Sequence, residues 1–162
     1  MRRIIVALSA LAAVAAGSLT VVPAAHAAVD VTLDSVTVAP PKAGRKANVI
    51  IKATLAQQQY ADISVDVTLS GFEASGTFPF RDGACPAKLV QVKVPAEVFQ
   101  CGWTQNGADA VLSMAISGTF PTSGLQIKVN KGSVRTPSKA GSYKVTLSSW
   151  AFSPISDTVT VK

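Results

Sequence analysis

Apolar and polar residues alternate along most of the chain beyond its apolar N-terminal segment, a pattern typical of strands with one face in a core. The clearest run is Ile63 to Ser70, in which every second residue is apolar. The same pattern predicts strands over 90–94, 112–116, 125–129, 143–147 and 159–161. No helical apolar stripe persists through this region, so the sequence predicts an all-β protein.

Two earlier segments, 31–38 and 48–55, are strand-like but irregular. Val36 and Val38 fall on the opposite parity from Val31 and Leu33, which fits either a β-bulge between the two pairs or burial on both faces. In the second segment apolar residues run continuously over 49–51, which fits either a bulge or burial on both faces.

Turn-forming residues separate these runs and fix how many strands we expect. Asn106-Gly107 is the strongest hairpin signal, and Arg81-Asp82-Gly83 is a second. Breaks are also predicted at 40–44, 121–124 and 137–141. Eight to ten short strands at this spacing predict two packed antiparallel sheets or a barrel.

The N-terminus has the organisation of a secretory signal peptide. Residues 1–27 combine Arg2 and Arg3, an apolar stretch and a small-residue end at Ala25-His26-Ala27. Cleavage would leave residues 28–162 as a single β-sandwich domain, secreted and either extracellular or associated with the cell envelope. No second apolar stretch approaches the ~20 residues of a membrane span, so no transmembrane anchor is predicted.

The net charge and the distribution of basic residues bear on what kind of partner the protein binds. Removing Arg2 and Arg3 lowers Lys plus Arg from 15 to 13 against 9 Asp plus Glu, so the net charge falls from +6 to +4. The basic residues are dispersed along the sequence, whereas nucleic-acid grooves cluster them with stacking aromatics. We therefore expect a protein or glycan partner outside the cell and no nucleic acid. A mild attraction to anionic envelope polymers or lipid head groups is an alternative to an ordinary solvated surface, which the dispersed charge favours.

Cys85 and Cys101 are the only two cysteines, and in an exported chain they predict a structural disulfide. A reactive thiol or a zinc site is the alternative. Both would lack a histidine partner, because the only histidine, His26, lies in the signal peptide.

Candidate catalytic chemistry is sparse once that histidine is lost. Neither a Ser-x-x-Lys nor a Gly-x-Ser-x-Gly motif occurs after the signal peptide. Asp62 and Asp66 are a candidate carboxylate pair, and Asp82 and Asp109 are candidate calcium-binding loop acids. Surface and turn roles are the alternative for all four, so we predict no enzyme, no cofactor and no metal.

Aromatic residues are the better candidates for recognition. Trp103 and Trp150 are possible platforms for stacking a sugar ring, with core packing as the alternative. Trp103 lies two residues after Cys101, where packing against the disulfide is expected. Trp150 lies near a strand end and is expected to be the more exposed.

One motif resembles a known family. In Lys139-Ala140-Gly141-Ser142-Tyr143-Lys144-Val145, a glycine precedes a tyrosine by two and an apolar residue follows by two. This resembles the tyrosine corner of immunoglobulin-like domains, here of a secreted bacterial kind. The resemblance covers 125–161 and implies an antiparallel immunoglobulin-like sandwich with one disulfide, in which the Tyr143 hydroxyl bonds to a backbone group. The close cysteine spacing departs from the antibody pattern, so their disulfide is expected to staple neighbouring segments.

The leading functional hypothesis is a secreted non-enzymatic module that acts by surface recognition or as an envelope-associated structural protein. A secreted hydrolase or protease inhibitor is the first alternative, with Lys88 and Lys93 presented on a disulfide-braced loop. A carbohydrate-binding module that uses an exposed tryptophan is the second.

Overall fold

The computed structural model describes residues 30–94 and 96–162, so the predicted signal peptide lies outside the described residues. This part of the chain is all-β, with every strand pair antiparallel, as the alternation predicted. Its strands are β1 (Asp30–Ala39), β2 (Asn48–Leu69), β3 (Glu73–Ala74), β4 (Phe78–Asp82), β5 (Val90–Lys93), β6 (Glu97–Asn106), β7 (Asp109–Val129), β8 (Val134–Arg135), β9 (Gly141–Ser149) and β10 (Phe152–Val161).

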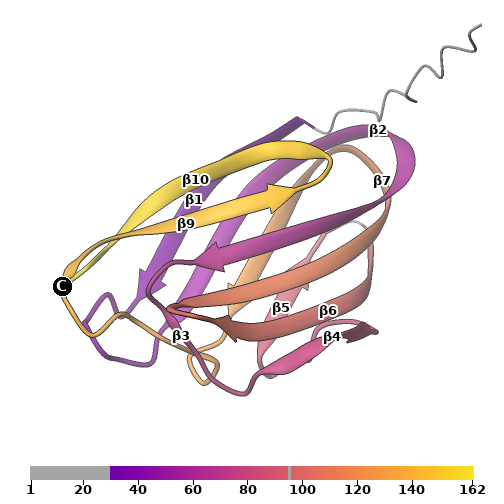
Figure 1. Cartoon of the computed structure of the whole chain (residues 1–162). Helices are drawn as coiled ribbons and strands as arrows, with labels where there is room; N and C mark the ends of the chain where they lie inside the picture. Colours follow the sequence, from indigo (N-terminus) through magenta and orange to yellow (C-terminus); the bar gives the residue numbers. More distant parts are fainter. Residues whose placement is uncertain (1–29, 95) are drawn as a thin grey trace, which may run out of the picture.

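Two long strands, β2 and β7, build the sandwich by passing through both of its layers (Figure 1). They are 22 and 21 residues long and pair with each other, with register shifts between Leu55 and Ala61. On one side of this irregularity the strand order is β1–β2–β7–β5, and on the other it is β10–β9–β2–β7–β6–β4. The bent ribbon therefore joins two layers that face each other.

The apolar positions of the alternating segments fill the space between the layers. Ile63, Val65, Val67 and Leu69 on β2 are at most 1% exposed, and they pack in one cluster with residues of the other layer. Burial alone contributes ~25 cal/mol per Å² of apolar surface removed from water, so this shared interior is the main stabilising term.

The structure settles both irregular segments. The register of β1 shifts between Leu33 and Ser35, so of the two explanations offered for the change of parity the bulge is the one observed. In β2, Val49 and Ile51 are buried while Ile50 is half-buried and pairs in regular register, so this run contains neither a bulge nor full burial on both faces.

Turn signals were less reliable guides than alternation. Asn106-Gly107 does form the β6–β7 hairpin, in which Asn106 pairs with Asp109. Asp82-Gly83 ends β4 without making a hairpin, since β4 pairs with β6 and β5 pairs with β7. The break predicted at 121–124 is wrong, because β7 runs through it as one strand. Its pairing with β2 shifts register there, from Leu55 with Ser123 to Gln57 with Phe120.

Among the described residues, no helix is long and apolar enough to cross a membrane.

Candidate anion-binding site

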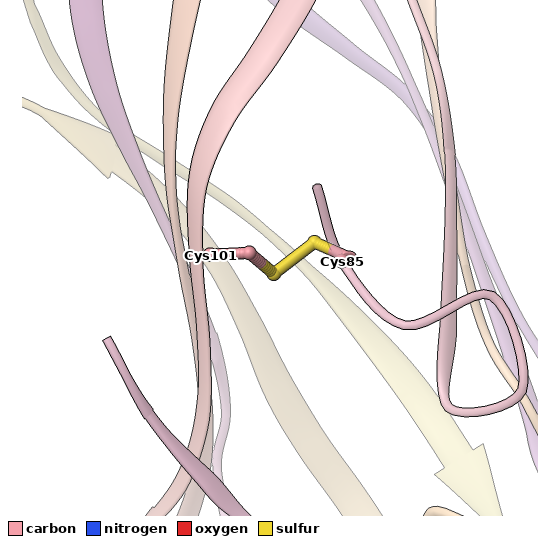
Figure 2. Close-up of a disulfide and its surroundings, with 2 residues drawn as sticks. All are labelled: Cys85 and Cys101. Atoms are coloured by element: carbon pink, nitrogen blue, oxygen red, sulfur yellow. A yellow bond between two sulfur atoms is a disulfide. The ribbon is translucent and has the colours of Figure 1, made fainter. Parts of the chain in front are cut away.

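The predicted disulfide is present and ties the segment after β4 to β6 (Figure 2). Cys85 and Cys101 are bonded with their Cα atoms 5.2 Å apart. Cys101 is buried on β6, whereas Cys85 is half-buried. The bridge thus staples neighbouring segments, the role expected from its short spacing.

The two tryptophans lie in opposite environments. Trp103 is 0% exposed, and its indole Nε1 donates to the carbonyls of Ser75 and Ser133, each at 3.2 Å. A ring without an exposed face cannot stack a ligand, so the prediction of Trp103 as a stacking platform is wrong. Trp150, at the turn between β9 and β10, is 57% exposed and keeps a ring at the surface.

Lys88 and Lys93 do not share one protruding loop. Lys88 lies in a turn closed by hydrogen bonds from the amides of Leu89 and Val90 to the carbonyl of Pro86. The Asn130 side chain braces this turn by donating to the Lys88 carbonyl at 3.1 Å. Lys93 lies on β5, so the expected inhibitory loop is a tight turn followed by a strand.

Tyr143 closes one end of the sandwich. Its hydroxyl donates to the Lys139 carbonyl at 2.8 Å, and its ring meets Phe72 edge to face at 6.3 Å. A Cβ at Gly141 would meet the ring at an ordinary 3.5 Å. At Gly71, where φ is +76°, a Cβ would come within 3.0 Å of the same ring. Sequence reasoning missed Gly71, which is far from Tyr143 in the chain.

The acidic candidates serve local structure. Oδ1 of Asp82 accepts a side-chain amide at 2.8 Å, and Oδ1 of Asp109 accepts the Gly71 amide at 2.9 Å. Asp62 and Asp66 lie on β2, in the part of the strand that pairs with β7. Across 30–94 and 96–162, no group of three or more His, Cys, Asp or Glu side chains converges as a metal site would require.

Basic residues, in contrast, do come together, around a hollow that no sequence motif predicted. The hollow measures about 530 Å³ and lies where the β1–β2 connection meets the turn after β7 and the short strand β8. Five exposed cationic side chains line it, together with Pro40 and Gly44: Lys42, Arg45, Lys46, Lys131 and Arg135. We call this cluster the basic hollow.

A buried threonine fixes the loop that carries three of these cations. Thr136 is 2% exposed, and its hydroxyl donates to the Lys42 carbonyl at 2.5 Å and accepts the Arg45 amide at 3.0 Å. The Thr136 amide donates to the Arg45 carbonyl at 2.8 Å, and the Gly44 amide donates to the Pro137 carbonyl at 2.8 Å. The loop backbone is therefore held before any partner arrives.

The other wall of the hollow is held in the same way. The Lys131 amide donates to Oδ1 of Asn48 at 2.9 Å, and Nη1 of Arg135 donates to the Gly44 carbonyl at 3.2 Å. Lys46 and Arg135 stand opposite each other in an antiparallel bridge. Like charges in that relation repel each other. Glu73 forms an ion pair with Arg135, 3.5 Å from its Nε, and none is seen between Glu73 and Lys46 in the described part of the chain.

This arrangement is suited to binding an anion. The backbone that carries the cations is fixed in advance, so little loop entropy remains to be lost on binding. Guanidinium groups bind phosphate and carboxylate through paired N–H donors, and lysines add mobile point charges. Sequence reasoning missed the site because some 90 residues separate the loop from its partners, as in the Arg45–Thr136 contact.

Comparison with known proteins adds no function. No family model and no curated protein matches the chain. A crystal structure of a DUF4466 family protein from Parabacteroides merdae is similar over 83% of this chain at 15% identity, with a TM-score of 0.36. The match covers 43% of that protein, so this chain spans less than half of its length.

Proposed function

We propose that the protein is a secreted, non-enzymatic β-sandwich module that recognises an anionic partner outside the cell through the basic hollow. The observation that carries the proposal is the gathering of five cations around one hollow where, among the described residues, a single carboxylate forms an ion pair, at Arg135. The cations of such a cluster repel one another, which costs stability. Residues that cost stability in this way are expected where they serve binding.

Two features support action outside the cell. The N-terminal 27 residues have the organisation of a signal peptide, and the Cys85–Cys101 disulfide suits an oxidising compartment. The sequence that would remain after cleavage has no histidine to shuttle protons at neutral pH, which favours binding over catalysis.

We also infer an immunoglobulin-like arrangement of the sandwich. The order β1–β2–β7–β5 is similar to the A–B–E–D sheet of such domains, and β10–β9–β2 is similar to their G–F–C sheet. The Tyr143 hydrogen bond to the Lys139 carbonyl on the approach to β9 supports the same assignment.

Calorimetric titration of the purified protein with tripolyphosphate at low ionic strength tests the anion-binding proposal. We expect Lys46→Gln/Lys131→Gln, which leaves the loop's backbone hydrogen bonds intact, to weaken binding about 10-fold. Arg81→Gln/Lys144→Gln removes the same charge from β4 and β9 and is expected to bind as the natural protein does. Equal affinity in all three proteins, or no binding by the natural one, would overturn the proposal.

The exposure of Trp150 favours a second candidate, carbohydrate binding by ring stacking. A glycan that stacks on Trp150 should change the tryptophan fluorescence of the natural protein and leave Trp150→Ala unaffected. Since Trp103 is buried in both proteins, an unchanged spectrum across polysaccharides would eliminate this candidate.

A further inference from the structure

A second set of lysines lies on the outer face of the layer formed by β1, the first half of β2, the second half of β7, and β5. Paired residues of an antiparallel sheet point to the same face, so the register places them in rows. One row runs Ser35–Lys52–Gln126–Lys93 across the four strands, and the next runs Thr37–Ile50–Lys128–Gln91. Lys52, Lys93 and Lys128 form what we call the lysine track.

Two lysines of the track line a second hollow, of about 600 Å³. Lys52 and Lys93 lie on two sides of it, and a Cβ added at Gly124 on its floor would meet nothing within 4 Å. One acid, Asp34, also lines the hollow, and its carboxylate accepts the Thr54 hydroxyl at 2.9 Å. In the described part of the chain, none of the three track lysines is in an ion pair.

The track and the basic hollow are continuous along β2. Asn48, whose side chain holds Lys131 of the basic hollow, lies on the outer face two residues before Ile50 and four before Lys52. Strands advance about 3.4 Å per residue, so the step from Asn48 to Lys52 is about 14 Å. The lysines of the track on the outer face of this layer therefore follow on from those of the basic hollow at the end of the sandwich.

We propose that the partner is a linear polyanion, which seats one segment in the basic hollow and runs on along the lysine track. The inference rests on the proposed function and adds that the anionic partner is a linear polymer. A compact anion would fill the basic hollow and leave the track empty, whereas a chain with anionic groups at regular intervals reaches both. The track presents no aromatic side chain for base stacking, which favours a phosphate or carboxylate polymer over nucleic acid.

Titrations with phosphate chains of two lengths separate this inference from the proposed function. Tripolyphosphate is short enough for the basic hollow alone, and long-chain polyphosphate can occupy both regions. We expect Lys52→Gln/Lys93→Gln to bind tripolyphosphate as the natural protein does and long-chain polyphosphate about 10-fold more weakly. The slope of log K against log salt for the long chain should also become shallower by about 1.4. Arg81→Gln/Lys144→Gln is the charge-matched control and should leave both affinities and the slope unchanged.

The other possible outcomes of these titrations distinguish failure of the linear-polyanion inference from failure of the anion-binding proposal. If the track variant binds both chains as the natural protein does while Lys46→Gln/Lys131→Gln loses both, the linear-polyanion inference falls and the anion-binding proposal stands. If the natural protein binds neither chain, both fall. If the track variant loses tripolyphosphate as strongly as the long chain, the track is part of a compact site and the inference is again overturned.

Discussion

Lys46 and Arg135 stand directly opposite each other in an antiparallel bridge, although 88 residues of sequence lie between them. Both line the basic hollow, and Glu73 contacts only the arginine. The fold therefore makes two basic residues direct cross-strand neighbours.

We predict that Lys46→Gln stabilises the protein without ligand, because it removes this repulsion. The gain should be a few tenths of a kcal/mol at low salt, the scale of a cross-strand charge pair. Thermal unfolding at low and high salt measures it, and the difference should shrink as screening grows. A lower Tm for Lys46→Gln at low salt would show that the lysine is held by contacts that outweigh repulsion.

We predict that Cys85→Ala lowers the free energy of unfolding by about 2–5 kcal/mol, because the bridge closes a loop between residues 16 apart in sequence. Denaturant unfolding measures the loss. Reductant should destabilise the natural protein by a similar amount and leave the variant unchanged. A natural protein indifferent to reductant would contradict a stabilising role for the bridge.

Tyr143→Phe should cost about 1 kcal/mol, because it deletes the hydrogen bond to the Lys139 carbonyl and keeps the ring against Phe72. Chemical denaturation resolves a change of this size. A variant as stable as the natural protein would mean that water replaces the hydroxyl at no cost.

Gly71→Ala should destabilise more than Gly107→Ala. Both glycines have positive φ, +76° and +59°, so both substitutions carry backbone strain. Only at Gly71 does the added Cβ also come within 3.0 Å of the Tyr143 ring, whereas at Gly107 it meets nothing within 4 Å. Equal losses of stability in the two variants would show that the tyrosine ring moves aside freely.

The sequence was most informative where the signal is local. Alternation located the buried residues of β2, such as Val65 and Val67, and the change of parity marked the irregular stretch after Leu33, where the structure has a bulge. Both follow from the two-residue period of a strand. The disulfide could also be predicted, because the chain has two cysteines, and a predicted signal peptide makes their pairing the default.

What the sequence did not reveal depends on contacts between distant segments. Residues 48–55 and 63–70 read as two strands because alternation lapses between them, yet antiparallel pairing with β7 joins them into one. Trp103 can be buried because its indole N–H donates to the carbonyls of Ser75 and Ser133. No sequence pattern indicates that these two carbonyls lie beside it. The basic hollow exists because Thr136 fastens a loop some 90 residues away, so basic residues that look dispersed in sequence meet in space.

The most direct test of the central claim is to map the backbone amide NMR shifts of the isotope-labelled protein during titration with tripolyphosphate. The basic hollow predicts that the largest shifts fall on Ala43 to Lys46 and on Lys131 to Arg135, with the β9–β10 turn at Trp150 unmoved. Shifts centred on Trp150, or spread evenly over every surface lysine, would contradict recognition through the basic hollow.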